Sequence, residues 1–210
     1  MTITTIFFLG FIIAYIGVIP PGLLNMTAAK ISLKEGHVRG IMFSIGASVV
    51  VIFQAGIAAV FARYLSNHPD VVNILQRVAL VIFILVTIYY LRFANNNAVR
   101  DFDTDRKSKH SRFLQGIFLS AINLFPVPFH AYMTISIASL GWMEFNNINI
   151  ASYVAGATCG TFAMFYLYIF LFEHYISKNL ASQRNMNRTI GYITGLVAVI
   201  TLIQIIIERQ

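Results

Sequence analysis

The chain has 210 residues, of which 58% are hydrophobic and only 11% are charged, and its mean hydropathy is +0.73. A soluble domain carries roughly twice that share of charged residues, so the composition indicates an integral membrane protein. The single cysteine, Cys159, excludes a disulfide framework and a dithiol redox centre.

Stretches with almost no charged residues follow one another along the chain. Each is long enough for a helix of roughly 20 residues that crosses a bilayer. The stretches are Met1–Ala29, Gly40–Ala62, Val71–Leu91 with Arg77 as its one charge, Phe113–Met143, Phe145–Phe172 and Thr189–Ile207. We therefore expect an all-α integral membrane protein with six transmembrane helices.

Basic residues concentrate in the first, third and fifth connections between these stretches, which hold twelve of the 15 Lys and Arg residues. Short connections rich in Lys and Arg remain on the cytoplasmic side. We therefore expect both termini to lie outside, and the basic surface to meet anionic lipid headgroups. The longest polar stretch, Arg92–Arg112, mixes both signs of charge, and a nucleic-acid partner is not expected.

Two prolines interrupt the first stretch, in the segment "IGVIPPGLLN", and two more interrupt the fourth, in "INLFPVPFH". A proline in a helix interior removes a backbone donor and clashes with the preceding turn, which costs about 3 kcal/mol or more. No water is present in a bilayer to bind the freed groups. We expect transmembrane helices 1 and 4 to be broken at these prolines.

Six spans divide into two sets of three, and an odd number of spans makes the second set inverted relative to the first. The second and fifth stretches share a Gly-Ala-Ser/Thr triplet, at Gly46 and Gly156. We predict one transmembrane transporter domain over residues 1–210. It consists of a first three-helix repeat (1–92), a cytoplasmic basic loop (93–112) and a second three-helix repeat (113–210).

Proline-interrupted spans at matching positions of two inverted halves are typical of a transport site. A broken helix frees carbonyl groups before the break and amide donors after it, and these can bind an ammonium group and a carboxylate. The residues expected to bind substrate are Pro20, Pro21, Gly22, Asn25, Asn123, Pro126 and Pro128. The alternative is a passive kink that improves helix packing.

His130 is the best candidate for a proton carrier, because the charge of a histidine changes near neutral pH and ionisable groups inside membranes are usually functional. The alternative is a neutral histidine that donates to a carbonyl freed by Pro126 or Pro128. For Gln54 and Thr158 we expect hydrogen bonds between helices rather than a functional role.

Three features of the first half resemble the LysE/RhtB (lysine exporter) family of bacterial amino-acid exporters. They are a proline-glycine motif at the end of the first span, Gly36-x-x-x-Gly40 before the second span, and Gly46 within it. The resemblance implies six helices in two inverted repeats, an inner-membrane location, and export driven by proton-motive force.

The resemblance also implies two site elements. Pro20, Pro21 and Gly22 would form the first, and Asn123 and Pro126 the second. The chain departs from the family pattern at Leu23, where a proline usually follows the glycine, and at Val127, where a lysine is usual. These departures concern the substrate and the coupling ion rather than the fold.

The function expected from the sequence is export of amino acids or related small metabolites by a secondary transporter. A metal or inorganic-ion exporter of similar architecture is the first alternative, although it would need buried carboxylates, thiolates or several histidines. A membrane enzyme would need converging nucleophiles, acids or metal ligands, and none is found; a non-transport membrane protein is the remaining alternative.

We expect no cofactor and no bound metal. The expected partners are a small-molecule substrate and membrane lipids, and the sequence leaves a homo-oligomer open.

Overall fold

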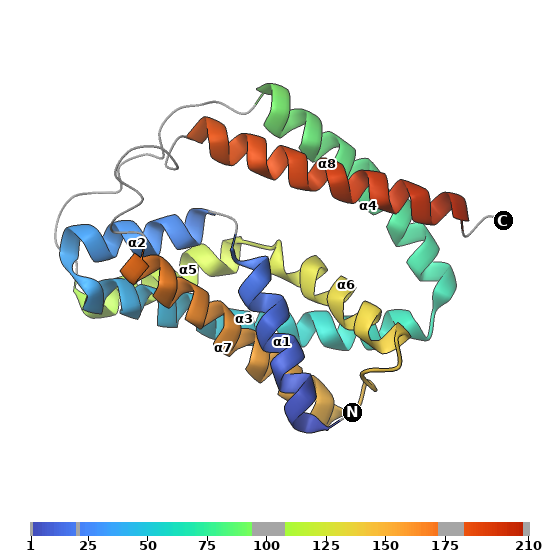
Figure 1. Cartoon of the computed structure of the whole chain (residues 1–210), viewed down its shortest axis with the longest axis horizontal. Coiled ribbons are helices and arrows are strands. Elements are labelled where there is room, and N and C mark those ends of the chain that lie inside the picture. Colours follow the sequence, from blue (N-terminus) through green and yellow to red (C-terminus); the bar gives the residue numbers. More distant parts are fainter. Residues whose placement is uncertain (1, 20–21, 94–107, 172–182, 208–210) are drawn as a thin grey trace. The chain divides into compact units, whose positions relative to one another are not determined.

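The computed structural model describes residues 2–19, 22–93, 108–171 and 183–207, and within these ranges the chain is helical with no strand. In chain order the helices are α1 (Ile3–Gly17), α2 (Leu23–Glu35), α3 (His37–Ser66), α4 (Pro69–Ile88), the π-helical turn η1 (Tyr89–Phe93), α5 (Lys109–Ile122), α6 (Pro126–Ser139), α7 (Asn147–Leu171) and α8 (Gln183–Ile207) (Figure 1). The expected all-α class is confirmed for the described residues.

The helices belong to two compact units. The first unit comprises Met1–Tyr64 and Asp105–Tyr175, and therefore contains α1, α2, nearly all of α3, α5, α6 and α7. The second comprises Leu65–Thr104 and Ile176–Gln210, with α4, η1 and α8. The predicted third and sixth spans thus make up the second unit, and the other four predicted spans make up the first.

Both proline-containing stretches form two helices rather than one. The first stretch gives α1, which ends at Gly17, and α2, which begins at Leu23. The fourth gives α5 and α6, which are separated by residues 123–125 and bent by 64° relative to each other. Each stretch therefore contains a helix break close to its pair of prolines.

Two of the described helices, α3 and α7, are long and apolar enough to cross a membrane, and the bent pair of α5 and α6 adds a third span if it is counted as one. Three shorter segments are also apolar: Ile3–Gly17, Leu80–Phe93 and Thr194–Ile203. By this measure the described helices supply two or three spans, and the layout of six spans stays a prediction.

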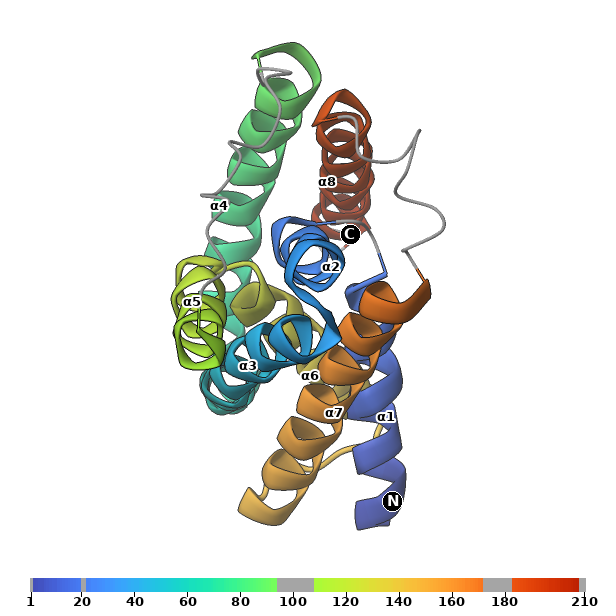
Figure 2. The same ribbon diagram turned by 90° about the vertical axis from the view of Figure 1, so that its left-hand side faces the viewer.

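Glycines bring α1 and α7 into direct backbone contact (Figure 2). Gly10 of α1 lies against the carbonyl group of Tyr153, and Gly156 of α7 lies against the carbonyl group of Phe7. A Cβ atom at either glycine would overlap these carbonyl oxygens. Small residues at such crossings let membrane helices approach closely enough for van der Waals packing to hold them together.

Helices α3 and α5 cross in the same way. Gly46 of α3 lies against the carbonyl group of Phe113, and Gly116 of α5 lies against the carbonyl group of Phe43. The two triplet glycines noted in the sequence, Gly46 and Gly156, thus both lie at backbone crossings.

The two crossings are related by a constant shift along the sequence. Residues of α1 and their counterparts in α5 are 106 positions apart, as in Gly10 and Gly116. Residues of α3 and α7 are 110 positions apart, as in Gly46 and Gly156. The buried residues of α6 follow the first shift, because each lies 106 positions after a buried residue of α2. These pairs are Leu24 and His130, Asn25 and Ala131, Ala28 and Thr134, and Ile31 and Ile137.

Two apolar clusters fill the first unit. Cluster 1 is formed by Ile6, Ala14, Val51, Ala55, Ala59, Ile137, Met143, Ile150, Tyr153, Val154 and Ala157. Cluster 2 is formed by Leu24, Ala28, Ile31, Phe43, Ala47, Phe165 and Ile169. Each cluster draws residues from both predicted halves of the chain.

The two glycines before the second predicted span have different roles. Gly36 separates α2 from α3 with φ at +96°, a conformation that side chains disfavour, and a Cβ there would meet nothing within 4 Å. Gly40 lies in α3, where a Cβ would be 3.1 Å from the carbonyl oxygen of Ala28. Gly36 therefore shapes the turn, and only Gly40 serves close packing.

In the second unit, α4 and α8 run antiparallel and side by side (Figure 1). Gly191 of α8 packs against Leu91 of η1. The hydroxyl groups of Thr87 and Thr194 form a hydrogen bond of 3.0 Å between the helices. A small residue and a polar pair thus contribute to the packing of these two antiparallel helices.

The glycine crossings can be tested with single methyl groups. We expect Gly116→Ala and Gly156→Ala each to lower the free energy of unfolding by about 1–3 kcal/mol, because the new Cβ overlaps backbone atoms that cannot move aside. Gly56→Ala is the matched control, because it lies in α3 with nothing within 4 Å of the added Cβ. Alanine also favours a helix over glycine by about 1 kcal/mol. The measurement is the melting temperature of each purified variant in detergent, and equal melting temperatures for all three would contradict the packing described here.

Candidate functional site

The first helix break lies between Val18 and Gly22. Val18 caps the C-terminus of α1, and Gly22 precedes α2 in an extended conformation with no side chain capping the helix N-terminus. Gly22 is half-buried, whereas Asn25, one turn further, is only 4% exposed. Pro20 and Pro21, which the sequence places at this break, lie outside the described residues.

Two side chains bind the carbonyl groups that the first break leaves without helical partners. The Asn25 amide donates to the carbonyl oxygen of Val18 over 2.7 Å. The Tyr168 hydroxyl of α7 donates to the carbonyl oxygen of Ile19 over 2.5 Å, and the side chains of Asn25 and Tyr168 also hydrogen-bond each other. These bonds satisfy backbone groups that no water can reach inside a bilayer.

At the second break, α5 ends at Ile122 and α6 begins at Pro126. Pro126 and Pro128 have no backbone N–H. The amides between and after them are already used: Val127 donates to Leu124, and Phe129 donates to the carbonyl of Phe125. The first turn of α6 therefore presents no free amide donor at these four positions.

Gln54 of α3 binds the second break. Its side-chain Nε2 donates to the carbonyl oxygen of Ser120 over 3.0 Å and to that of Asn123 over 2.8 Å. Gln54 is 6% exposed and connects two helices, as the sequence suggested. Thr158 does not connect helices in this way, because its hydroxyl donates to Val154 one turn earlier in α7.

The two breaks are bound crosswise. Tyr168, from the second half of the chain, holds the break between α1 and α2, whereas Gln54, from the first half, holds the break between α5 and α6. The breaks also adjoin each other, since a Cβ at Gly17 would lie 2.6 Å from the ring of Phe129 in the first turn of α6. The fold therefore brings the described residues that flank the two helix breaks into one region of the first unit.

The remaining predicted site residues of the second break differ in exposure. Asn123 and Pro126 are half-buried, and Pro128 is exposed. Asn123 contributes its backbone carbonyl to the break, in the bond from Gln54.

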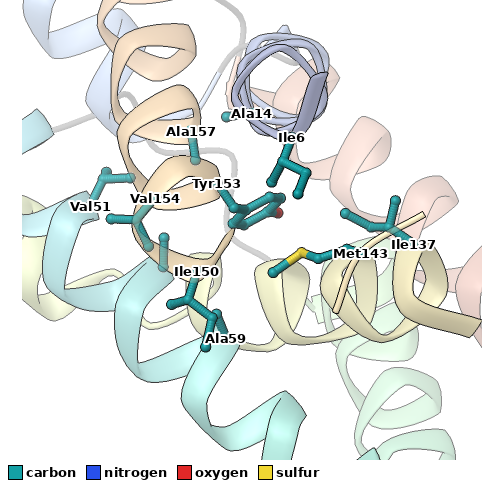
Figure 3. Packing of buried hydrophobic residues seen from close by; sticks show 11 residues of the cluster. Ile6, Ala14, Val51, Ala59, Ile137, Met143, Ile150, Tyr153, Val154 and Ala157 are labelled. Atoms are coloured by element: carbon teal, nitrogen blue, oxygen red, sulfur yellow. The ribbon is translucent and has the colours of Figure 1, made fainter. Parts of the chain in front are cut away.

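His130 is 3% exposed and lies one turn into α6. Its Nδ1 is 2.9 Å from the hydroxyl of Tyr153, so its partner is a tyrosine side chain rather than the freed carbonyl considered from the sequence. Tyr153 itself is fully buried in cluster 1 between Ile6, Ile137 and Met143 (Figure 3). The pair is a polar contact enclosed by apolar side chains.

A buried ion pair escaped the sequence analysis. Glu35 at the end of α2 is 7% exposed, and Arg112 in the first turn of α5 is 3% exposed. Arg112 holds both carboxylate oxygens, with Nε at 3.0 Å from Oε2 and Nη2 bonded to Oε1, and it also donates to Gln115. In the sequence, Arg112 is notable only as one of the basic residues that indicate the orientation of the chain in the membrane. The signal available in the sequence was that Glu35 is the sole acidic residue before Asp70 and lies among the basic residues Lys30, Lys34 and Arg39.

Two other surveys bear on the kind of site. Among the described residues, no group of three or more His, Cys, Asp or Glu side chains converges as metal ligands would. A shallow groove of about 620 Å³ runs between the start of α1 and the start of α7, lined by residues such as Phe7, Ile148 and Ala155. It is apolar, and it includes none of the predicted site residues.

Comparison with known proteins agrees with the resemblance seen in the sequence. A family model described as LysE type translocator matches residues 15–205, which include both helix breaks. No curated protein and no solved structure matches the chain.

The Glu35–Arg112 pair makes a prediction about stability. Removing one partner, in Glu35→Gln or Arg112→Gln, is expected to destabilise the protein by about 3–5 kcal/mol, because it leaves an unpaired buried charge or its unsatisfied donors. The double variant Glu35→Leu/Arg112→Met is expected to recover most of that loss, since no buried charge remains.

The matched control for this pair is Arg39→Gln. Arg39 approaches the same carboxylate only to 3.9 Å and its side chain is 28% exposed, so about 1 kcal/mol or less is expected. Melting temperatures in detergent provide the comparison. A double variant as unstable as the single variants would contradict this account of the pair.

Proposed function

The chain belongs to the LysE type translocator family, and from this premise we propose that it is a secondary transporter that exports amino acids or related small metabolites, driven by proton-motive force. Family membership and the apolar helices make it a membrane transporter rather than an enzyme. The substrate class and the driving force are the parts that we propose.

The observation that carries the proposal is the pair of adjacent, crosswise-bound helix breaks. Transporters built from inverted repeats bind their substrates where discontinuous helices meet near the middle of the membrane. We propose that Pro20, Pro21, Gly22 and Asn25 form the first element of such a site. Asn123, Pro126 and Pro128 form the second element.

We further propose that the chain is one domain of six transmembrane helices in two inverted repeats, residues 1–92 and 113–210, joined by a cytoplasmic loop over 93–112. The constant shifts between contacts support this arrangement, because exchanging the two halves converts the α1–α7 crossing into the α5–α3 crossing. The contact between α4 and α8 supports it too, since these are the third helices of the two halves.

The proposed location is the bacterial inner membrane, with both termini outside. The distribution of basic residues along the sequence supports this orientation. The competing function, export of a metal or inorganic ion, receives no support from the described residues, among which no cluster of metal-ligating side chains occurs.

His130 is the proposed proton carrier. His130 is buried, so its protonated form is energetically unfavourable among apolar side chains. Its contact with the Tyr153 hydroxyl fixes the orientation of the ring. A histidine in this setting can couple its protonation to a change in packing around cluster 1.

Efflux from cells loaded with dipeptides tests the proposed activity. Cells that make the protein are expected to release one or a few amino acids faster than cells without it. Pro21→Ala and Pro126→Ala should abolish most of this release, because alanine permits a continuous helix at the break. Pro69→Ala is the matched control, since Pro69 begins α4 as Pro126 begins α6 but lies at neither helix break. Unchanged release of every amino acid, at confirmed membrane levels of protein, would reject amino-acid export.

Proton coupling is tested separately with His130→Gln in proteoliposomes. Glutamine keeps a polar group near Tyr153 but cannot titrate. We expect exchange of substrate across the membrane to persist and uptake driven by a proton gradient to be lost. His110→Gln is the control, because His110 is exposed near the start of α5. Gradient-driven uptake that is intact in His130→Gln would exclude His130 as the carrier.

A further inference from the structure

Two buried side-chain atoms in the described part of the chain have no hydrogen-bond partner: Oγ of Ser48 and Oε1 of Gln54. A serine hydroxyl in a helix can rotate to bond the carbonyl four residues earlier, as Ser44 does with Gly40. The amide oxygen of Gln54 cannot be satisfied in this way, because it is an acceptor and needs a donor. We therefore ask which donor from outside the chain it could bind.

The orientation of the Gln54 amide is fixed by chemistry. Its nitrogen lies within 3.0 Å of two carbonyl oxygens, those of Ser120 and Asn123, which can only accept hydrogen bonds. Exchanging the nitrogen and oxygen of the amide would place three acceptors together. Oε1 is bonded to the same carbon as Nε2, so this unpaired acceptor lies at the second helix break.

The first four residues of α6 offer this acceptor no donor, although the amides of Leu124 and Phe125 just before them form no described backbone hydrogen bond. Pro126 and Pro128 have none, and the amides of Val127 and Phe129 are bonded within the chain. The carbonyl of Asn123 has two lone pairs, and the described bonds use only one of them, for Gln54. The unpaired amide oxygen of Gln54 thus lies at the same break as the carbonyl oxygen of Asn123, which can accept a second hydrogen bond.

The first break is different. There the carbonyl oxygens of Val18 and Ile19 are already bound, by Asn25 and Tyr168 respectively. The position equivalent to Gln54 in the second half, 110 residues later, is Met164, which is equally buried and has no comparable acceptor. Among the described residues of the two breaks and the side chains that bind them, the unpaired buried side-chain acceptor is therefore Oε1 of Gln54.

We propose that Oε1 of Gln54, together with the carbonyl oxygen of Asn123, binds the ammonium group of the exported solute. This inference rests on the proposed export of amino acids and assigns one end of the substrate to one break. A positively charged donor suits the site because it can bond both acceptors, and charged hydrogen bonds are stronger than neutral ones. Gln54 thereby selects solutes with a free amino group.

The test compares an amino acid with the 2-hydroxy acid that carries the same side chain, in which a hydroxyl replaces the ammonium group. In proteoliposomes, each compound competes against uptake of the labelled amino acid identified by the efflux experiment; for alanine the competitor is L-lactate. The wild-type protein should prefer the amino acid by about tenfold or more, the factor expected from a charged hydrogen bond.

Gln54→Met, which places the residue of the equivalent position at this site, should remove most of the preference. Affinity for the amino acid falls, while that for the hydroxy acid changes little. Leu33→Met, at an exposed position of α2, is the control for the substitution itself and should behave as wild type.

Each outcome decides the matter. If Gln54 only holds the helix break, both competitors weaken equally in Gln54→Met and the ratio is unchanged, which overturns the proposal. A wild-type protein that binds hydroxy acid and amino acid equally also overturns it, without any variant, and indicates that a water occupies Oε1. If no amino acid is exported at all, the proposed function fails first, and this assignment fails with it.

Discussion

A helix that is interrupted inside a bilayer must find partners for the backbone groups that it frees, and the rest of this structure depends on how that requirement is met. Here each break is bound by a side chain from the other half of the chain, Tyr168 for the first and Gln54 for the second. These two contacts form only when the two halves of the chain are packed together.

The glycine crossings explain how those side chains reach their targets. Backbone contact at Gly156 and Gly46 brings α7 against α1 and α3 against α5. Tyr168 and Gln54 follow these glycines on the same helices, α7 and α3, by twelve and eight residues. A close crossing of each helix pair thus positions the polar side chain further along α7 or α3. Packing and hydrogen bonding are two consequences of one arrangement.

The sequence predicted what is local and missed what is distant. The breaks could be predicted because proline acts on its own turn, and the importance of Gly46 and Gly156 because glycine has few reasons to occur in a helix. The ion pair of Glu35 and Arg112 joins residues 77 positions apart, and the sequence around either residue does not indicate which residue is its partner. For the same reason the sequence suggested a freed carbonyl as the alternative partner of His130, whereas the partner is Tyr153 on a different helix. Gln54 was interpreted as a helix-bridging residue, and its unpaired oxygen is visible only once both carbonyl partners are known.

Four buried polar groups discussed above have an apolar counterpart at the equivalent position of the other half. The pairs are Gln54 and Met164, His130 and Leu24, Tyr153 and Phe43, and Arg112 and Ile6, all buried. A strictly repeated structure would present every polar group twice, which would give two equal sites for one asymmetric solute. Shape is therefore repeated, in the glycine crossings and the helix breaks, whereas the polarity of these four positions is not. One end of an amino acid differs from the other, and a site that distinguishes them must be built where the two halves differ.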